Sequence, residues 1–548
     1  MAYLQRIPRR YDRCVPSLTL EQFRALAQQN RARSPSKTLA IPVGVRLLED
    51  QLTPVLAYRR LVSADERTAP SFLLESVEGG QRQGRHSILS AHPTRQVIAR
   101  GNDVTIIHAN GASESFTHDN PLHVPRELIA DIEFVEPSQD RASAGLPECF
   151  IGGWVGYAAY DTVRYAVPEK LADVPEDDRE LPDLHMALHE HVVVFDHVEK
   201  LVHVVGLAML APNDDVDDVY AKLMRSLDKI STQIQTHSKP LSAGRVERGR
   251  RMPVLESNMT QAQYEDAVVR AQEYIRAGDI FQVVLGQRFE RRSKADPFDV
   301  YRALRAVNPS PYMVYMQSPG CILVAASPEI LCRVRSNDEG RLVVTNRPLA
   351  GTRRRGKDDA EDQRLEQELL ADEKECAEHA MLVDLARNDV GQVALPGTIE
   401  CDPVMVVERY SHVMHISSTV TGVVREGLDA WDALHAALPV GTVSGAPKVR
   451  AMQIIDELEP VKRGPYGGGL GYVGLDGQMD IALALRTIVV PTKGWDADAT
   501  DHEWMYHVQA AAGVVLDSVP ESEFKETIAK AGALAQAIEL ADAAFVTH

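Results

Sequence analysis

The chain has 548 residues and a formal net charge of −19, and 44% of its residues are hydrophobic and 25% charged. This composition is typical of a folded globular protein, and the length favours two domains or one large two-layered one. The acidic balance argues against nucleic acid or an anionic membrane as partner, and no apolar run approaches the ~18 residues of a membrane span.

The cysteines and the N-terminal stretch bear on location. The six cysteines are scattered and form no CxxC pair, which indicates reduced thiols and a cytoplasmic protein. The basic N-terminal stretch lacks the apolar segment of a signal peptide. A transit peptide is disfavoured because a helix-like segment already begins at Leu18-Thr19.

The first half of the chain reads as strands enclosed by two helices. Thr19 is a plausible N-cap for a short amphipathic helix. Short apolar runs set off by turn residues predict strands at residues 55–58, 71–74, 97–99 and 201–207. Residues 216–234 then predict a helix. Residues 236–253 are polar, basic and poor in apolar residues, so they predict a linker between regions 1–240 and 254–548.

The second half contains three predicted helices. They cover residues 261–277, capped by Thr260, residues 359–387 and residues 521–543, with many β-like segments between them. Strands and helices cluster rather than alternate strictly. This pattern predicts an α+β fold with large antiparallel sheets instead of a doubly wound parallel sheet.

Glycine-rich segments give one short internal repeat and two misleading motifs. GGWVGY at 152–157 recurs as GGGLGY at 467–472, which indicates strands that another backbone or a ligand approaches closely. The P-loop spacing at 351–357 is followed by Asp358 instead of Ser or Thr. The GxGxxG at 469–474 leads into a turn and a strand, so no helix N-terminus is available for a pyrophosphate. Nucleotide binding is therefore not expected.

Two predicted helices carry carboxylates suited to a metal. Glu378 lies one turn before Leu382, at the edge of a buried face, where a carboxylate is costly unless it is paired or bound to metal. Glu526 and Lys530 share a helix face, which is equally typical of a surface ion pair. If the two glutamates converge to ~4 Å, they repel by roughly 4 kcal/mol at an effective dielectric constant of about 20. A hard dication such as Mg²⁺ would relieve that repulsion.

Several segments together resemble the chorismate-utilising enzymes, and anthranilate synthase component I most closely. They are LLES (73–76), GRHS (84–87), NPSPYM (308–313), LAGTR (349–353), KECAEHAMLVDLARND (374–389), RYSHVMHISSTVTG (409–422), PVGTVSGAPK (439–448), GPYGGGLGYVG (464–474), ALRT (484–487), QAAAGVVLDSVPESEFKET (509–527) and Lys530. The match runs in order along most of the chain. It implies a two-subdomain sandwich of antiparallel sheets flanked by helices, with a regulatory or structural region at 1–240 and a chorismate-binding catalytic domain at 254–548.

The resemblance also implies roles for individual residues. The Mg²⁺ ligands would be Glu378 and Glu526. The substrate contacts would be Gly351, Thr352, Tyr466, Arg486, Ala510, Ala511, Gly513 and Lys530, with Ala511 standing where a glycine is expected. The catalytic residues would be His415, Glu329 and Thr442. From the residues alone, His415 reads equally as a structural strand histidine and Glu329 as a turn carboxylate.

The implied reaction has two stages and is regulated. Ammonia, supplied by a separate glutamine amidotransferase subunit, would add to ring carbon 2 of chorismate as the carbon-4 hydroxyl leaves, and loss of pyruvate and a ring proton would then give anthranilate. Glu329 would serve the first stage and His415 the second or both. Tryptophan would inhibit by binding at Glu75, Ser76, Pro311, Tyr312 and Met313. A plain strand and turn is the alternative interpretation of these five residues.

Three other functions remain to be weighed. A 4-amino-4-deoxychorismate synthase resembles this chain but carries a lysine nucleophile where Ala350 stands. Isochorismate and salicylate synthases carry a lysine base where this chain has Gln282. A non-catalytic amino-acid sensor would retain only the effector site, and the presence of Glu378, His415 and Arg486 argues against it.

Overall fold

The computed structural model describes residues 15–63, 66–78, 82–138, 140–236, 241–245, 255–410, 413–496 and 502–546. Most of the linker predicted at 236–253 lies outside these ranges. Among the described residues, no helix is both long and apolar enough to cross a bilayer.

Two helix starts follow directly from local sequence. Thr19 precedes α1 (Leu20–Arg33) and Thr260 precedes α5 (Gln261–Ala277). Each threonine hydroxyl accepts the backbone N–H three residues on, and the side-chain oxygen of the glutamine at that position accepts the threonine backbone N–H. These capping boxes satisfy amide groups that the first helical turn leaves unpaired. Both predicted starts are confirmed.

Two predicted elements were wrong. Residues 55–58 lie in a helix, α2 (Pro54–Leu61), because Thr53 caps it and Pro54 takes the first-turn position that proline favours. The helix predicted at 359–387 is two helices, α7 (Asp359–Ala371) and α8 (Glu373–Gly391). Between them Asp372 is extended and caps α8 by accepting the N–H groups of Lys374 and Glu375.

Most of the strands belong to two large sheets. The first sheet has, in spatial order, β14 (Glu256–Ser257), β15 (Gln282–Ser293), β29 (Trp504–Val514), β28 (Thr487–Pro491), β17 (Cys321–Ser327), β16 (Tyr312–Ser318), β2 (Ser71–Glu75), β5 (His86–Ala91), β12 (His191–Asp196), β13 (Leu201–Leu210), β1 (Thr38–Leu48) and β9 (Ile132–Phe134), with β25 (Gly445–Ala446) beside β15. The second has β21 (Glu400–Cys401), β24 (Val420–Val423), β19 (Leu342–Asn346), β18 (Ile330–Ser336), β27 (Met479–Leu483), β26 (Gly469–Gly474), β10 (Gly153–Ala158), β11 (Leu184–His189), β6 (Arg95–Arg100), β7 (Asp103–His108) and β8 (Ser113–Thr117).

The sheets are antiparallel apart from the pair β1–β9, as the α+β prediction requires. Each sheet takes strands from both sides of the predicted linker, so regions 1–240 and 254–548 are interleaved in space. The two glycine-rich repeats lie on β10 and β26. These strands pair with each other, and Gly156 lies opposite Gly471. The division of the chain into a regulatory and a catalytic region stays a prediction about function.

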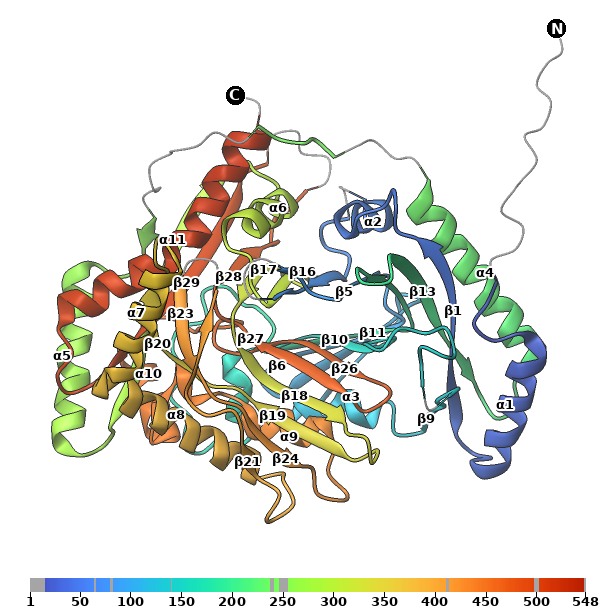
Figure 1. The fold of residues 1–548 in the computed structure, drawn as a ribbon, viewed down its shortest axis with the longest axis horizontal. Coiled ribbons are helices and arrows are strands. Elements are labelled where there is room, and N and C mark those ends of the chain that lie inside the picture. Colours follow the sequence, from blue (N-terminus) through green and yellow to red (C-terminus); the bar gives the residue numbers. More distant parts are fainter. Residues whose placement is uncertain are drawn as a thin grey trace, which may run out of the picture.

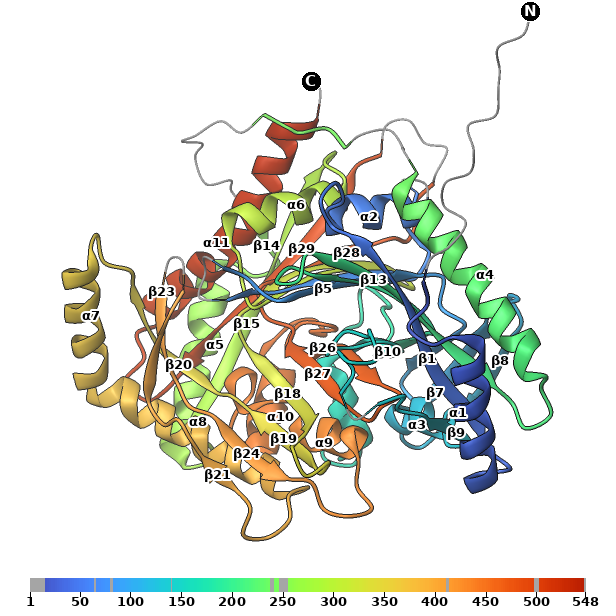
Figure 2. The same cartoon turned by 45° about the vertical axis from the view of Figure 1, so that its right-hand side comes forward.

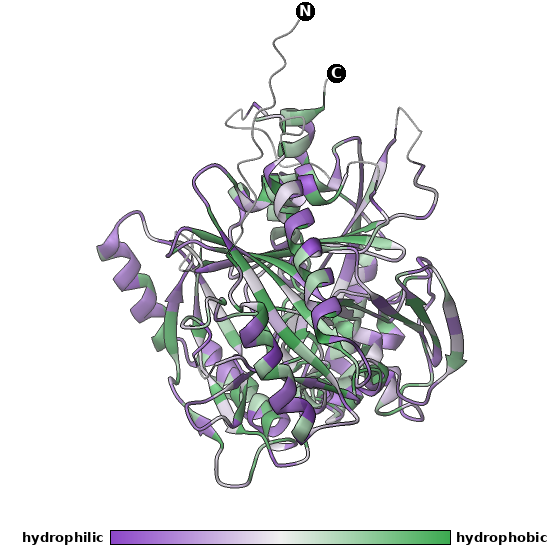
Figure 3. Ribbon diagram, turned by 90° about the vertical axis from the view of Figure 1, so that its right-hand side faces the viewer, coloured by the Kyte–Doolittle hydropathy of each residue, from purple (hydrophilic) through white to green (hydrophobic). Residues whose placement is uncertain are grey.

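The two sheets pack face to face around a shared core (Figure 1). Side chains from the first sheet, such as Phe72 and Leu323, meet Val155, Leu470 and Tyr472 from the second. Helices α1, α2, α4 (Val216–Gln235), α6 (Pro297–Val307) and α11 (Pro520–Phe545) cover the other face of the first sheet. Helices α8 and α9 (Ala430–Ala437) cover the second, and α10 (Lys448–Leu458) packs with α5 against β15. Figure 3 shows hydrophilic residues concentrated on the outer helices.

Smaller elements complete the chain. A three-stranded sheet, in the order β20 (Leu349–Arg354), β23 (Val413–Ser417) and β22 (Val406–Arg409), belongs to neither layer. Helix α7 covers it and stands away from the body (Figure 2). The remaining elements are β3 (Val77–Glu78), β4 (Arg82–Gln83), α3 (Val124–Glu127) and the 3₁₀ helices η1 (Pro121–His123), η2 (Tyr160–Tyr165) and η3 (Gly441–Val443).

Candidate active site

The site lies where the chain twice crosses between the sheets. Glu329 sits in the crossing from β17 to β18, and Arg486 in the return crossing from β27 to β28. The crossings are joined because the Ala326 N–H donates to the Arg486 carbonyl at 3.1 Å and the Leu483 N–H to the Glu329 carbonyl at 3.0 Å. Arg486 has a φ of +46°. A left-handed backbone at a non-glycine residue costs of order ~1–3 kcal/mol and is often kept at functional sites.

Glu329 is a buried carboxyl group that has no ion-pair partner at contact distance among the residues the structure describes. Its side chain is 4% exposed and accepts a hydrogen bond from the Thr442 hydroxyl at 3.1 Å. Burial raises the pKa of Glu329 to about 8, although Thr442, the more distant Arg486 and the Leu349 backbone N–H oppose the rise. At neutral pH this carboxyl group is protonated and can donate a proton.

His415 has the opposite protonation preference. Burial, and then the positive charges of Arg486 and Lys530, lower the pKa of His415 to about 4, so its ring is neutral at pH 7. Its Nδ1 lies 3.0 Å from the Gly351 carbonyl oxygen and 3.1 Å from Thr352 Oγ1. A carbonyl can only accept, which assigns the proton to Nδ1 and leaves Nε2 free to act as a base.

A bulge in β20 explains why Gly351 is a glycine. The pairing of β20 with β23 shifts register between Ala350 and Thr352, and Gly351 takes a φ of +63° there. This conformation suits glycine, and it points the Gly351 carbonyl at His415.

The predicted metal ligands lie on separate helices, Glu378 on α8 and Glu526 on α11. Burial raises the pKa of Glu378 on α8, and the negative charges of Glu375 and Glu526 raise it further. Gln282 Nε2 donates to Glu378 Oε1 at 3.0 Å. Glu526 on α11 pairs with Lys530 at 2.7 Å, as the helix spacing predicts. Among the described residues, no three His, Cys, Asp or Glu side chains gather into a metal cluster, so water and substrate oxygens would have to complete a site held by two carboxylates.

Strand β29 forms a backbone wall beside these groups. Lys530 Nζ donates to the Ala511 carbonyl at 2.8 Å, and the Tyr466 hydroxyl hydrogen-bonds with the Ala511 backbone. A side chain at Gly513 would extend to within 3.7 Å of Glu378 and 2.9 Å of Gln282. Ala510 differs from its predicted neighbours because its methyl group packs into the core on the other face of the strand, so it could meet a substrate through its backbone alone.

Taken together, these residues come from separate helices, strands and loops that the fold brings close to one another. The Arg486 cation lies within electrostatic reach of both the protonated Glu329 carboxyl group and the neutral His415 imidazole, and the Lys530 cation lies within reach of His415. Such a set can bind a multiply charged anion, protonate a leaving hydroxyl and remove a carbon-bound proton.

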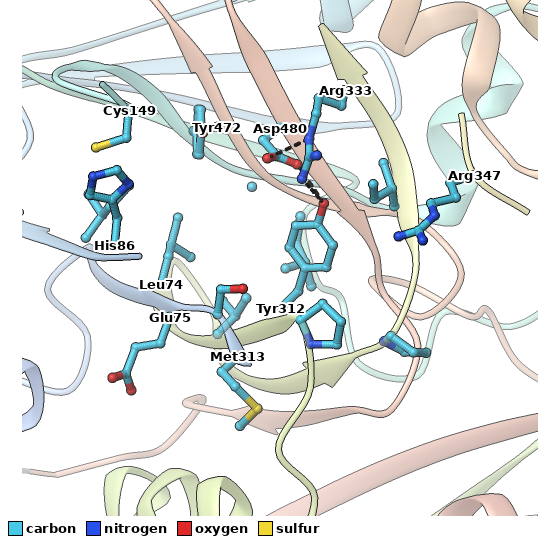
Figure 4. Close-up of a pocket in the computed structure, with 18 of the residues that line it drawn as sticks. Leu74, Glu75, His86, Cys149, Tyr312, Met313, Arg333, Arg347, Tyr472 and Asp480 are labelled. Carbon is cyan, nitrogen blue, oxygen red and sulfur yellow. Dashed lines mark hydrogen bonds and ion pairs between the residues drawn. The ribbon is translucent and has the colours of Figure 1, made fainter. Parts of the chain in front are cut away.

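The five predicted effector residues all line one cavity of about 670 Å³ between the sheets, which we call the effector cavity. Tyr312 donates to Asp480 at 2.8 Å and accepts from Arg333 at 2.9 Å, so its hydroxyl is fixed on one wall (Figure 4). Met313 and Pro311 come from the same strand start as Tyr312, whereas Glu75 and Ser76 come from β2 and the residue after it.

Glu75 does not present a free carboxylate to this cavity. Its two oxygens accept hydrogen bonds from the Tyr301 hydroxyl at 2.6 Å and from Arg305 at 2.8–3.0 Å, both on α6. Figure 4 shows the carboxylate pointing away from Tyr312 and Arg333. The ammonium group of an amino-acid effector bound at Glu75 would therefore compete with Arg305.

Sequence reasoning missed the residues that lie between the effector cavity and the catalytic groups. Tyr410 stacks its ring edgewise against His415, with ring centres 5.6 Å apart, and lines the effector cavity as well. Arg347 and Glu408 form an ion pair beside it. No local pattern marks these residues, because their partners are distant in sequence; only the RYSHVMHISS segment pointed to their neighbourhood.

The family model for chorismate binding enzymes matches residues 70–536. The anthranilate synthase alpha subunit 1, chloroplastic, of Oryza sativa subsp. indica is 53% identical over 525 residues, covering 92% of this chain and 89% of that protein. The anthranilate synthase component 1 of Thermus thermophilus is 47% identical over 503 residues, covering 92% and 98%. The crystal structure of anthranilate synthase component I from Streptococcus pneumoniae superposes with a TM-score of 0.68 at 33% identity, covering 89% and 99%.

The chain belongs to the chorismate binding enzymes, and within them to the anthranilate synthase component I or alpha subunits. This confirms the resemblance and the α+β fold predicted from the sequence.

Proposed function

We propose that this chain is the chorismate-converting subunit of anthranilate synthase, in the first step of tryptophan biosynthesis. The reaction is chorismate plus ammonia giving anthranilate, pyruvate and water. The observation that carries the proposal is that the Arg486 charge acts on both a protonated buried Glu329 and a neutral His415, with the Lys530 charge also acting on His415.

In the first stage Glu329 acts as general acid. Ammonia forms a bond to ring carbon 2, the two conjugated ring double bonds shift, and the bond from carbon 4 to its hydroxyl breaks. The leaving oxygen takes the proton of the Glu329 carboxyl group and departs as water. A carboxyl group with a pKa of about 8 is still protonated at neutral pH, as this role requires. Thr442, which donates to Glu329, orients it.

In the second stage His415 acts as base. Its Nε2 removes the proton from ring carbon 2 while the bond from ring carbon 3 to the enolpyruvyl oxygen breaks, and the ring becomes aromatic. The enolpyruvate that leaves takes up a proton on its methylene carbon to become pyruvate. The Nδ1 contact with the Gly351 carbonyl keeps the required tautomer. Thr352, 3.1 Å from the same nitrogen, fixes the plane of the ring.

The cations and the backbone wall would bind the substrate. Arg486 can grip one carboxylate in a two-pronged hydrogen bond, and Lys530 supplies a point charge beside β29. Tyr466 and the backbone of Ala511 and Gly513 would form the flat side of the pocket against which the ring lies.

Glu378 and Glu526 would hold Mg²⁺, which would neutralise and orient the ring carboxylate of chorismate. The donor set fits, because the negative charge of Glu526 acts on Glu378 and raises its pKa, and Glu378 lies beside the β29 wall, 3.7 Å from a side chain built at Gly513. In their charged form they are the hard oxygen donors that Mg²⁺ prefers.

Ammonia would come from a separate glutamine amidotransferase subunit. No cysteine here stands in a Gly-x-Cys-x-Gly segment, so the chain lacks that nucleophile motif. The isolated chain is then expected to use ammonium and not glutamine. Cytoplasmic location also stays a prediction, to be checked by cell fractionation, since relatives such as the rice protein are named chloroplastic.

Tryptophan would bind in the cavity between the sheets and act as the feedback inhibitor. Ser76, at the end of β2, lines the cavity, and Met313 would pack on the indole ring. Substitution of Ser76 by a larger residue is expected to weaken inhibition and to leave the uninhibited rate unchanged. Undiminished inhibition would remove Ser76 from the site.

The decisive experiment mixes the purified chain with chorismate, Mg²⁺ and ammonium and follows anthranilate fluorescence. Only the proposed function yields that product without a partner enzyme. Release of an amino-deoxy product would favour the 4-amino-4-deoxychorismate synthase, which the small Ala350 argues against. Binding of tryptophan with no turnover would favour the amino-acid sensor.

A further inference from the structure

The effector cavity and the catalytic groups have one wall in common. We call Arg347, Leu349, Glu408 and Tyr410 the shared wall; all four line the cavity of about 670 Å³. On the other side, the Leu349 backbone N–H hydrogen-bonds the Glu329 carboxyl group, and the Tyr410 ring contacts the His415 ring. Anything that displaces this wall from the cavity side therefore displaces groups on the catalytic side.

Tyr410 is the residue that spans the wall. It is 9% exposed, and its ring meets the His415 ring at 61° with centres 5.6 Å apart, a favourable edgewise contact. Its hydroxyl donates to Glu408 Oε2 at 2.9 Å, and Glu408 is paired with Arg347. One end of the side chain is thus bound to a cavity-lining ion pair and its ring fixes the proposed base.

The part of the fold that carries this wall is lightly anchored. Its three strands lie outside both large sheets, and in the described part of the chain their own core is built on four buried side chains, those of Leu365, Leu369, Met414 and Ile416. Small cores of this kind open and shift at low cost compared with the interior of a large sheet. Gly351, Thr352 and His415 all sit on β20 and β23 of this small sheet, so its position decides the geometry of the base.

The cavity suits a molecule that presses on this wall. Side chains from the large sheets, including Met313 and Tyr472, form one side, and the shared wall forms the other. An occupant that fills the space must therefore contact both a rigid and a movable surface. Coupling between two binding sites is reciprocal. An occupant that favours one position of the small sheet therefore changes the affinity for substrate by a certain factor, and bound substrate changes the affinity for the occupant by the same factor.

We infer that Tyr410 is a positioning residue that transmits occupancy of the effector cavity to His415, through its hydroxyl bond to Glu408 and its ring contact with the imidazole. The inference rests on the proposed function for the identity of the occupant, an aromatic amino acid tested here as tryptophan. Occupancy of the cavity is thus communicated through one side chain, Tyr410, and the movable three-stranded sheet.

The test compares full-length Tyr410→Phe and Tyr410→Leu with wild type, with ammonium as nitrogen donor. Tryptophan affinity is measured calorimetrically with and without saturating chorismate, and the ratio of the two dissociation constants is the coupling. Wild type is expected to show a coupling between about 5- and 150-fold, the usual range for linked sites. Tyr410→Phe, which keeps the ring and loses the Glu408 bond, should reduce it, and Tyr410→Leu should bring it to about one.

Tyr472→Phe is the matched control. Tyr472 lines the same cavity, but its hydroxyl accepts from Arg335 at 2.9 Å and its ring packs against Phe150; among the described residues, neither of these partners is a catalytic group. Loss of the Tyr472 hydroxyl should change tryptophan affinity by the same factor with and without chorismate, and so leave the coupling intact. Coupling undiminished in both Tyr410 variants, or lost equally in Tyr472→Phe, would overturn the inference.

A second readout does not depend on turnover. With histidine labelled at ring carbon ε1, the His415 resonance is assigned by its loss in His415→Gln. Tryptophan should shift that resonance in wild type and in Tyr472→Phe but not in Tyr410→Leu. A wild-type protein that forms no anthranilate yet shows this pattern would refute the proposed function alone, whereas an enzyme inhibited by tryptophan with no change at His415 would refute the inference alone.

Discussion

Replacing Glu329 by Gln isolates the proton that the buried carboxyl group is proposed to donate. Gln has the same shape and can keep a contact with Thr442, which donates to this side chain at 3.1 Å. It has no proton to give, so kcat should fall by about 10²–10⁴-fold, the usual contribution of general acid catalysis. In wild type, activity should decline as pH rises through about 8, where Glu329 loses its proton.

The same substitution has a calculable effect on stability. The pKa of Glu329 rises from its ordinary value of 4.5 to about 8 in the folded protein. At about 1.4 kcal/mol per pKa unit, deprotonating it in the folded state costs roughly 5 kcal/mol. Since the folded state holds the proton more tightly, the stabilisation is complete below the unfolded pKa and is lost as pH rises through about 8.

Urea unfolding of wild type and Glu329→Gln at a series of pH values measures this difference. From about pH 5 to pH 9 the wild-type free energy of unfolding should fall relative to the variant by several kcal/mol. Glu400→Gln, at an exposed carboxylate on β21, is the control and should run parallel to wild type. A difference between wild type and Glu329→Gln that stays constant with pH would refute the idea of a buried neutral acid.

Three further changes test the other roles. His415→Gln should still consume chorismate but accumulate the first-stage product, with anthranilate formation about 10²–10⁴-fold slower by chromatography; an undiminished anthranilate rate would exclude His415 as the base. Glu378→Gln and Glu526→Gln should each abolish Mg²⁺-dependent turnover without loss of circular dichroism signal, and near wild-type rates in a Mg²⁺ titration would contradict the metal assignment. Ala350→Lys should lose anthranilate formation while binding chorismate and Mg²⁺, because the long side chain is expected to block the approach of ammonia; unchanged product would show that residue 350 is remote from the reacting carbon.

Local signals predicted the elements that local chemistry controls. The capping threonines before α1 and α5 marked their starts because the hydroxyl bonds form within four residues. Apolar periodicity failed at residues 55–58, where a Thr-Pro start overrode a strand-like run. It also failed at Asp372, whose extended backbone is one residue inside an otherwise continuous helical pattern.

The site divides in the same way. The Glu526–Lys530 pair could be predicted because both residues lie on one helix face. The meeting of Glu329 with Thr442, 113 positions apart, came only from the resemblance, since nothing near either residue predicts it. The engagement of Glu75 by Arg305 and the contact of Tyr410 with His415 depend on how separate elements pack, and no periodicity encodes that packing.

The order of strands in the first sheet has a consequence for biosynthesis. Strands β28 and β29, among the last to leave the ribosome, fill the gap between β15 and β17. Until residue 514 has emerged, the nascent sheet exists as two pieces with unpaired edges, which are templates for wrong pairing and aggregation. Chaperone binding should therefore be strongest for chains stalled before β28. For the same reason neither residues 1–240 nor 254–548 should fold alone, whereas the two fragments synthesised together should complement each other.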